Sequence, residues 1–215
     1  MLLFVLLLGP VLVPAQETTS FRIGKLKYDG GGDWYANPTS LPNLAAYLRQ
    51  HTRASIALEE EVVPPSSPKI FQFPLLYMTG HGNVVFSRSE VQNLRRYCAA
   101  GGFLFIDDNY GMNEYITREL KKIFPDQELV EVPYSHPIYN QQWQFAEGLP
   151  KIHEHDGKPP QGFGIFLEGR LAVFLTYESD LGDGWEDPEV HNNPEEVRRK
   201  ALQMGANVIL YVINN

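Results

Sequence analysis

The sequence predicts an α/β sandwich, in which a mostly parallel β-sheet carries helices on both faces. Three observations support this fold class. Strand-like and helix-like segments alternate along the chain, helix-capping signals stand between them, and segments 74–80 and 103–107 are apolar without alternation. Alternating strands and helices are typical of parallel sheets. An unbroken apolar strand is typical of a sheet that is buried on both faces.

The first part of the chain contains three expected strands and one expected helix. Strands are predicted at residues 23–28, 54–58 and 74–80. A helix is predicted to start at Ser40, because apolar residues recur after it at the i, i+3, i+4 and i+7 positions of one helical face. These residues are Leu41, Leu44, Ala45 and Leu48.

A capping box marks the next helix. Ser87 and Glu90 have the spacing in which each side chain bonds the other's backbone N–H. The helix is expected to end at Gly101, since glycine readily adopts the left-handed conformation that closes a helix. Cys98 lies on the apolar face of this helix, which favours a buried hydrophobic role over a reactive thiol.

The last part of the chain continues the alternation. A helix is expected at 113–124 and a strand at 129–132. Residues 164–177 resemble a hairpin that turns at residues 168–169. The final helix is expected to begin with Pro194 in its first turn, where proline loses no helical hydrogen bond.

Length and charge narrow the class of protein. The chain has 215 residues, and residues 16–215 are predicted to form one domain. The formal net charge is −8 and the isoelectric point is about 5.2. An acidic surface repels phosphate backbones, so nucleic acid is not expected as a partner.

Residues 1–15 are predicted to form a signal peptide. They contain no charged residue, and Val13 and Ala15 have the spacing of a cleavage site before Gln16. The apolar run is shorter than the roughly 20 residues of a stable transmembrane span. The protein is therefore expected to be exported to the periplasm or the cell exterior, or to stay anchored if the segment is not cleaved.

The candidate functional residues follow the expected strands. Ligands of open α/β sheets bind outside the carboxyl ends of the strands, so we expect these residues to share one rim. They are Asp29, Asp33, Trp34, His81, Asp107, Asp108, Tyr110, His136 and Trp185.

These residues allow three kinds of function. Six of them suit binding of a small polar molecule or a carbohydrate, through stacking on aromatic rings and hydrogen bonds to carboxylates. This ligand-binding group is Asp29, Asp33, Trp34, Tyr110, His136 and Trp185. Alternatively, Asp107, Asp108 and His81 could be catalytic groups of a hydrolase, or the protein could be a non-catalytic partner in an envelope protein complex.

Neighbouring residues of a strand point to opposite faces of the sheet. The side chains of Asp107 and Asp108 are therefore expected to point to opposite faces of the sheet. The simplest role for one of them is to cap the following helix.

No cofactor is expected from the sequence, and a divalent metal is the one alternative that it leaves open. His81 and His136, together with an aspartate of the rim, would offer nitrogen and oxygen ligands. His153 and His155, in the segment "HEH", are expected to face solvent, because they lie in a loop rich in proline and glycine.

The segment "DGGGDW" (29–34) resembles a phosphate-binding loop at first sight. It lacks the lysine of a P-loop and the G-x-G-x-x-G spacing of a dinucleotide site, and its aspartates would repel phosphate. The glycines are therefore predicted to form a tight turn at the end of a strand.

Five blocks of sequence resemble a known family. They read "LKYDGGGDWYANPTSLPNL", "LLYMTGHG", "LRRYCAAGGFLFIDDNYG", "FPDQELVEVPYSHPIY" and "DLGDGWE". Over residues 21–215 the chain resembles the bacterial domain-of-unknown-function family 4159. The resemblance implies the class I glutamine amidotransferase-like superfamily, which has a flavodoxin-like three-layer sandwich.

The resemblance also implies where a nucleophile would stand. Amidotransferases of this superfamily carry a nucleophilic cysteine on a sharp turn after a central strand, and strand 103–107 corresponds to that strand by element order. Asp107, Asp108 and Asn109 occupy the turn here, without a cysteine or a serine. Glutaminase activity is therefore not expected.

Overall fold

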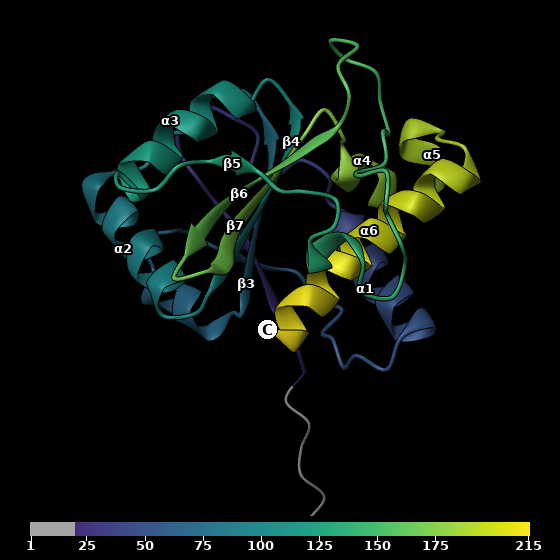
Figure 1. The fold of residues 1–215 in the computed structure, drawn as a ribbon, viewed down its shortest axis with the longest axis horizontal. Coiled ribbons are helices and arrows are strands. Elements are labelled where there is room, and N and C mark those ends of the chain that lie inside the picture. Colours follow the sequence, from purple (N-terminus) through teal and green to yellow (C-terminus); the bar gives the residue numbers. More distant parts are fainter. Residues whose placement is uncertain (1–19) are drawn as a thin grey trace, which may run out of the picture.

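A seven-stranded β-sheet forms the middle layer of the computed structural model, which describes residues 20–215 (Figure 1). The order of the strands across the sheet is β2-β1-β3-β4-β7-β6-β5. Their bounds are β1 Ile23–Leu26, β2 Glu61–Val63, β3 Leu75–His81, β4 Phe103–Tyr110, β5 Val130–Glu131, β6 Gln161–Leu167 and β7 Arg170–Tyr177. The segment predicted to direct export, residues 1–15, lies outside the described residues.

The sheet is parallel except at one side. Strands β2, β1, β3, β4 and β7 all pair in parallel, whereas β6 is antiparallel to both β7 and β5. The carboxyl ends of the five parallel strands therefore meet at one edge, which we call the rim.

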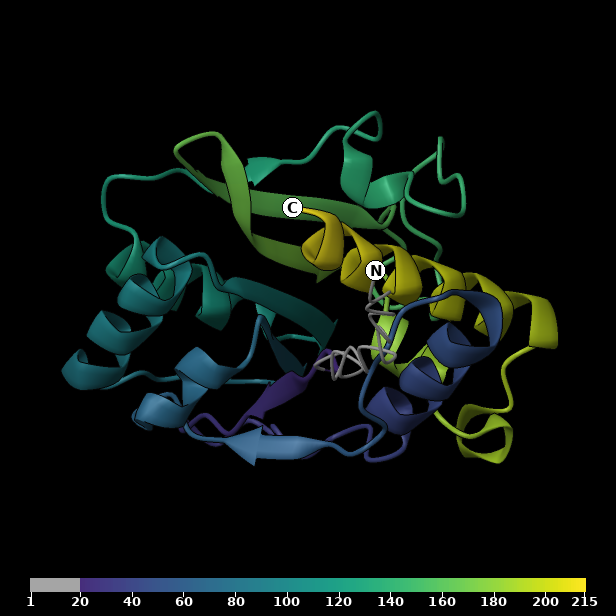
Figure 2. The same ribbon diagram turned by 90° about the horizontal axis from the view of Figure 1, so that it is seen from below.

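Helices cover both faces of the sheet (Figures 1 and 2). Helices α1, α4 and α6 pack on one face and α2 and α3 on the other, so the three-layer sandwich predicted from the sequence is confirmed. The bounds are α1 Ser40–His51, α2 Arg88–Ala99, α3 Asn113–Ile123, α4 Leu181–Trp185, α5 Pro188–His191 and α6 Glu195–Asn214, with short 3-10 turns η1 Pro68–Gln72 and η2 Pro137–Tyr139.

The apolar segments occupy the centre of the sheet. In β3, Leu75 and Tyr77 face α1 and α6, while Leu76 and Met78 face the α2 and α3 layer. All four side chains are buried. This burial on both faces explains why the segment is apolar without alternation.

The strand predicted at 54–58 is wrong in its position. Only Ile56 pairs with the sheet there, through an isolated bridge to Phe21. Pairing then breaks off and resumes in β2, at Glu61 opposite Gly24. Ile56 is buried in the α1 layer and Val63 in the opposite layer.

Two local predictions are confirmed in detail. Ser87 and Glu90 form both bonds of the capping box at the start of α2. The hairpin turns at Glu168 and Gly169, which have φ values of 50° and 83°. Residues 178–194 contain the short helices α4 and α5.

One side chain fixes a long connection to α6. The amide of Asn207 accepts hydrogen bonds from the backbone N–H groups of Gln142 and Trp143 at 3.1 and 3.2 Å. It also donates to the carbonyl groups of Tyr139 and Trp143 at 3.0 and 2.7 Å. The connection between η2 and β6 is thereby held against the α6 layer near its beginning.

Among residues 20–215, no helix combines the length and the apolar character that crossing a membrane requires.

Candidate functional site

Two loops of the rim lie directly against each other. A methyl group on Gly32 would lie 2.6 Å from the carbonyl oxygen of His81, so the turn after β1 touches the end of β3. Gly80 has a φ of 133°, and a methyl group there would lie 2.8 Å from the carboxylate of Asp33. The glycines thus allow a close approach of two backbones, in agreement with the predicted tight turn.

This approach places Asp33 beside His81. One carboxylate oxygen of Asp33 accepts the backbone N–H of His81, and the other lies 3.0 Å from Nδ1 of the imidazole. About half of the His81 side chain is exposed. With Nδ1 engaged by the carboxylate, Nε2 is the ring nitrogen left to act on a bound molecule. Asp29 is exposed at the start of the same turn.

Asp107 and Asp108 part to opposite faces, as predicted. Asp107 points toward α4, where its oxygens accept hydrogen bonds from Thr176 and from the backbone N–H groups of Leu181 and Gly182. Asp108 points toward α3 and accepts two backbone N–H groups at the start of that helix, at 2.8 and 3.1 Å. The helix-capping role considered for one of the pair therefore belongs to Asp108.

Burial changes the acidity of both carboxyl groups. It raises the pKa of Asp107 to about 7 and the pKa of Asp108 to about 6, although their hydrogen bonds oppose the shift. The charge of Asp180 acts in the same direction on both groups. Three buried carboxyl groups, those of Asp107, Asp108 and Asp180, therefore lie close enough at the rim for their charges to interact.

A chain of ring contacts continues along the rim. His81 lies opposite Tyr110 in the pairing of β3 with β4. The Tyr110 ring stacks on His155 with 4.5 Å between ring centres, and its hydroxyl donates to Asp156 at 3.0 Å. Nearly half of Tyr110 is exposed. Tyr110 therefore stands between the end of β3, which carries His81, and His155 and Asp156 of the connection before β6.

A cluster of carboxylates and imidazoles lies at the carboxyl end of β7. We call it the β7 cluster, and it contains His153, His155, Asp180, Asp183 and His191. Oδ2 of Asp180 contacts both Nε2 of His155 and Nδ1 of His153, the latter at 3.1 Å. Oδ2 of Asp183 lies 3.1 Å from Nδ1 of His153 and 3.7 Å from Nε2 of His191. Hydrogen bonds to Asp180 and Asp183 raise the pKa of His153 to about 10.

Neighbouring amides hold Asp183 in place. Its second oxygen, Oδ1, accepts hydrogen bonds from Asn37 at 2.7 Å and from Asn109 at 3.0 Å. Asn109 also donates to the Asn37 side chain and accepts from Thr79. Residues near the end of β4 and before α1 thus fix the orientation of a carboxylate on α4.

The backbone at the end of β7 is unusual. Glu178 and Asp180 both adopt left-handed conformations, with φ values of 57° and 58°. Such conformations are uncommon for residues other than glycine and cluster at functional sites. Here they turn the chain sharply, so that Glu178 meets Lys151 at 2.6 Å and Asp180 meets the histidines.

His136 does not join the rim. After β5 the chain folds back over the α6 side of the sheet, and His136 contacts the rings of Phe166 and Tyr211. Phe166 pairs with Leu171 near the start of β7, far along the strand from its carboxyl end. Nδ1 of His136 accepts the backbone N–H of Ile138, which makes it a cap of η2. The predicted metal pair of His81 and His136 is therefore not brought together.

Trp185 is a core residue. Its side chain is fully buried, makes tilted ring contacts with Tyr77 and Phe105, and donates its indole N–H to the carbonyl of Ala201. It offers no surface for stacking of a ligand. Trp34 is partly buried against the α2 side, with the ammonium group of Lys27 over its ring at 5.3 Å.

Most of the β7 cluster was not predicted from the sequence. His153 and His155 were expected to face solvent, yet both reach Asp180 from the connection before β6. The signal that could have revealed the cluster is the density of carboxylates directly after a buried strand, in "ESDLGDGWED" (178–187), combined with the two histidines of "HEH". Within residues 20–215, His153, Asp183 and His191 form the single group with metal-ligand spacing.

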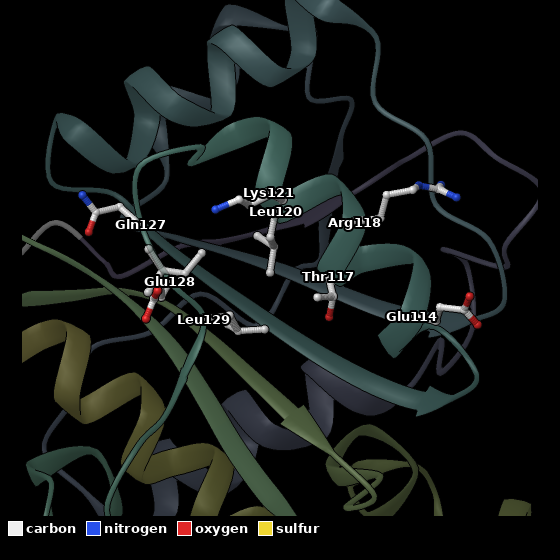
Figure 3. A pocket seen from close by; sticks show the side chains of 9 residues that line it. Glu114, Thr117, Arg118, Leu120, Lys121, Gln127, Glu128 and Leu129 are labelled. Atoms are coloured by element: carbon white, nitrogen blue, oxygen red, sulfur yellow. The ribbon is translucent and has the colours of Figure 1, made fainter.

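A separate hollow lies between α3 and the segment before β5 (Figure 3). In Figure 3 Leu120, Thr117 and Leu129 line its interior, while Arg118 points away. Its acidic residues, Glu114 and Glu128, are both exposed. The hollow contains no histidine and no buried carboxylate, so the rim is the better candidate for a chemical site.

The fold and the rim define an α/β-sandwich protein with a polar site of carboxylates and imidazoles at the carboxyl ends of its parallel strands. Residues 22–213 match the model of the family described as domain of unknown function DUF4159. The chain belongs to this family, as the resemblance of its sequence blocks predicted. No curated protein gives a significant match to the chain. The wider amidotransferase-like superfamily stays a prediction.

Proposed function

We propose that this protein is a hydrolase that activates water at the rim and acts on a small polar substrate. The observation that carries the proposal is the Asp33–His81 pair, in which a carboxylate orients a half-exposed imidazole. An imidazole held in this way is suited to general acid–base catalysis near neutral pH.

Water is the nucleophile in this proposal, because the nearby side-chain nucleophiles are engaged. The hydroxyl groups of Thr79 and Thr176 are buried and donate to Asn109 and Asp107. Cys98 lies within the α2 layer, where burial raises the pKa of its thiol to about 12. A buried, protonated thiol is a poor nucleophile.

The proposed reaction is complete without another reactant. Nε2 of His81 takes a proton from water while the oxygen of that water attacks the carbonyl carbon of an ester. The bond to the leaving alkoxide then breaks, and the imidazolium returns its proton to it. Asp33 stabilises the imidazolium between the two steps.

The surroundings of the pair favour an uncharged polar substrate. The exposed ring of Tyr110 offers a stacking surface, and Asp156 beside it offers hydrogen-bond acceptors. The carboxylates of the rim oppose anionic substrates. An acylated carbohydrate combines a neutral polar body with a hydrolysable bond, and it accords with the export predicted from residues 1–15.

The test compares two exposed histidines. The full chain is assayed against chromogenic acetyl esters and acetylated sugars, alongside His81→Ala and the matched control His51→Ala. His51 lies at the end of α1 and stacks on Tyr47. We expect kcat/KM to fall by about 100-fold or more in His81→Ala, the usual contribution of a general base, and to persist in His51→Ala. Equal rates in wild type and His81→Ala would contradict the proposal.

Carbohydrate binding without turnover is the second candidate, and it is favoured by the exposed ring of Tyr110. Binding to a glycan array should disappear in Tyr110→Ala and persist in Tyr35→Ala, which removes another exposed ring. Binding that survives in Tyr110→Ala would remove this ring from the site.

A further inference from the structure

The β7 cluster has the spacing of a metal site. Nδ1 of His153, Oδ2 of Asp183 and Nε2 of His191 all lie within 4.8 Å of one another. Oδ2 of Asp183 is 3.1 Å from the first nitrogen and 3.7 Å from the second. Ligands that bind one ion at about 2.0–2.2 Å stand roughly 3–3.5 Å apart. The three atoms therefore need only small movements to share an ion.

Two buried atoms at this centre lack hydrogen-bond partners. Nε2 of His191 is buried without a hydrogen-bond partner. Oδ1 of Asp180 is likewise buried and unpartnered, although Oδ2 of the same residue contacts His153. Only about 1% of the Asp180 side chain is exposed. Leaving buried polar atoms unpaired is costly, so each such atom calls for an explanation, and an ion is one.

The surroundings orient the ligands as they do in metal proteins. Nε2 of His153 lies 3.1 Å from the amide oxygen of Asn193, so Nδ1 is the ring nitrogen that faces Asp180 and Asp183, and an ion bound there would displace the proton that these carboxylates hold. Oδ1 of Asp183 is held by Asn37 and Asn109, so Oδ2 is the oxygen that turns toward the histidines. Outer contacts of this kind position ligands and support their affinity for a metal.

We propose that His153, Asp183 and His191 bind one divalent transition-metal ion, with Asp180 as the neighbouring carboxylate that balances its charge. Two imidazoles and carboxylates suit Zn²⁺, Mn²⁺, Fe²⁺ or Ni²⁺ better than Mg²⁺ or Ca²⁺, which prefer oxygen ligands alone. The site is distinct from the predicted pair of His81 and His136, and it does not depend on the hydrolase proposal.

The proposed ion would link three separate segments of the chain. Its ligands come from three segments: the connection before β6, α4 and α5. Binding would join these segments through bonds that the unfolded chain does not make, so the ion should stabilise the folded protein in proportion to its affinity.

The test is a titration of the full chain, first treated with a chelator, with Zn²⁺ and separately with Mn²⁺. Isothermal titration calorimetry should report one ion per chain for at least one of the two metals. His191→Ala and Asp183→Asn should each weaken binding by about 10-fold to 100-fold or more, since even residues outside the ligand set change affinity by that amount. His136→Ala and His51→Ala, which remove histidines elsewhere, should bind as wild type does.

Each result bears on the proposal. His191 lies on the short exposed helix α5, so His191→Ala should keep the circular dichroism spectrum of the wild type. X-ray absorption of the Zn²⁺ complex should show nitrogen and oxygen ligands at about 2.0–2.1 Å. Absence of one-to-one binding for both metals, or unchanged affinity in both ligand variants, would overturn the proposal. The titration contains no substrate, so failure of the hydrolase proposal leaves its outcome unaffected.

Discussion

The Asp33–His81 pair and the β7 cluster contain the same chemical groups, yet the chain supports them differently. The pair stands on glycine turns, and a third of Asp33 and half of His81 are exposed. The β7 cluster stands on buried residues, since the carboxylates of Asp180 and Asp183 are nearly inaccessible. Exposed ion pairs contribute little to stability, whereas buried polar networks are costly to disturb. Changes in the pair should therefore affect chemistry alone, and changes in the cluster should also affect folding.

The largest expected effect concerns the helix that carries Asp183. Trp185 in α4 is fully buried, so Trp185→Ala should lower the free energy of unfolding by about 3–5 kcal/mol through lost packing and a cavity. Chemical denaturation measures the change. Tyr35→Ala, at an exposed ring, serves as the control and should stay within about 0.5 kcal/mol of wild type. A loss below about 1 kcal/mol in Trp185→Ala would show that the cluster does not depend on the core.

A direct comparison replaces one aspartate in each group. Asp183→Ala removes the acceptor of Asn37 and Asn109 and should cost about 2–3 kcal/mol of stability, because buried donors are left unpaired. Asp33→Ala removes an exposed partner and should cost less than about 1 kcal/mol. Thermal or denaturant unfolding of both variants supplies the two values. Equal losses would mean that burial does not distinguish the two groups.

The pH dependence of stability should reveal the titration of Asp108, a carboxyl group that is affected by both the Asp33–His81 pair and the β7 cluster. The charge of Asp180 raises the pKa of Asp108 and that of His81 lowers it, so Asp108 senses both groups. Its pKa of about 6 in the folded protein exceeds the value near 4 of the unfolded chain, so the folded state binds the proton more tightly. The stability from this group is present below about pH 4 and is lost as pH rises through 6, a change of roughly 3 kcal/mol.

Asp108→Asn isolates that contribution. The variant loses part of the α3 cap at every pH, but it also loses the titration. Its stability relative to wild type should therefore improve as pH rises from 4 to 7. Two unfolding curves that run parallel across this range would contradict the raised pKa.

The smallest expected effect lies at the residue that connects the two groups. Tyr110→Phe keeps the ring that stacks on His155 and removes the hydroxyl that donates to Asp156. Stability should change by less than about 0.5 kcal/mol, because the bond is exposed. A larger loss, measured by denaturant unfolding, would indicate that Tyr110 couples the pair to the cluster.

The sequence predicts the fold better than the site, and particular residues show why. The strands 74–80 and 103–107 and the capping box of Ser87 and Glu90 are local patterns, so they can be read without knowing the rest of the structure. The same holds for the opposite directions of Asp107 and Asp108, which follow from strand geometry. The strand predicted at 54–58 failed because its pairing with the sheet is interrupted between Ile56 and Glu61, and a local pattern does not reveal where pairing partners lie.

The site depends on contacts between distant segments. Trp185 looks like a loop residue, and only its contacts with Ala201 and Gly205 of α6 make it part of the core. His153 looks exposed in a loop, and only the left-handed backbone at Asp180 brings a carboxylate to it. His136 follows a strand, but the chain turns back after it. A local pattern contains none of this information.

The four hydrogen bonds of Asn207 restrict the conformations of the connection from η2 to β6. The connection from η2 to β6 has almost no regular structure, and a long irregular segment gains conformational entropy when it is released. Asn207 removes much of that freedom by tying residues 139–143 to a helix. The part of the connection that Asn207 does not hold, from residue 144 to β6, carries His153 and His155. Asn207 contacts neither histidine, yet it shortens the segment of irregular chain that carries both. It thereby lowers the entropic cost of holding His153 and His155 at the β7 cluster.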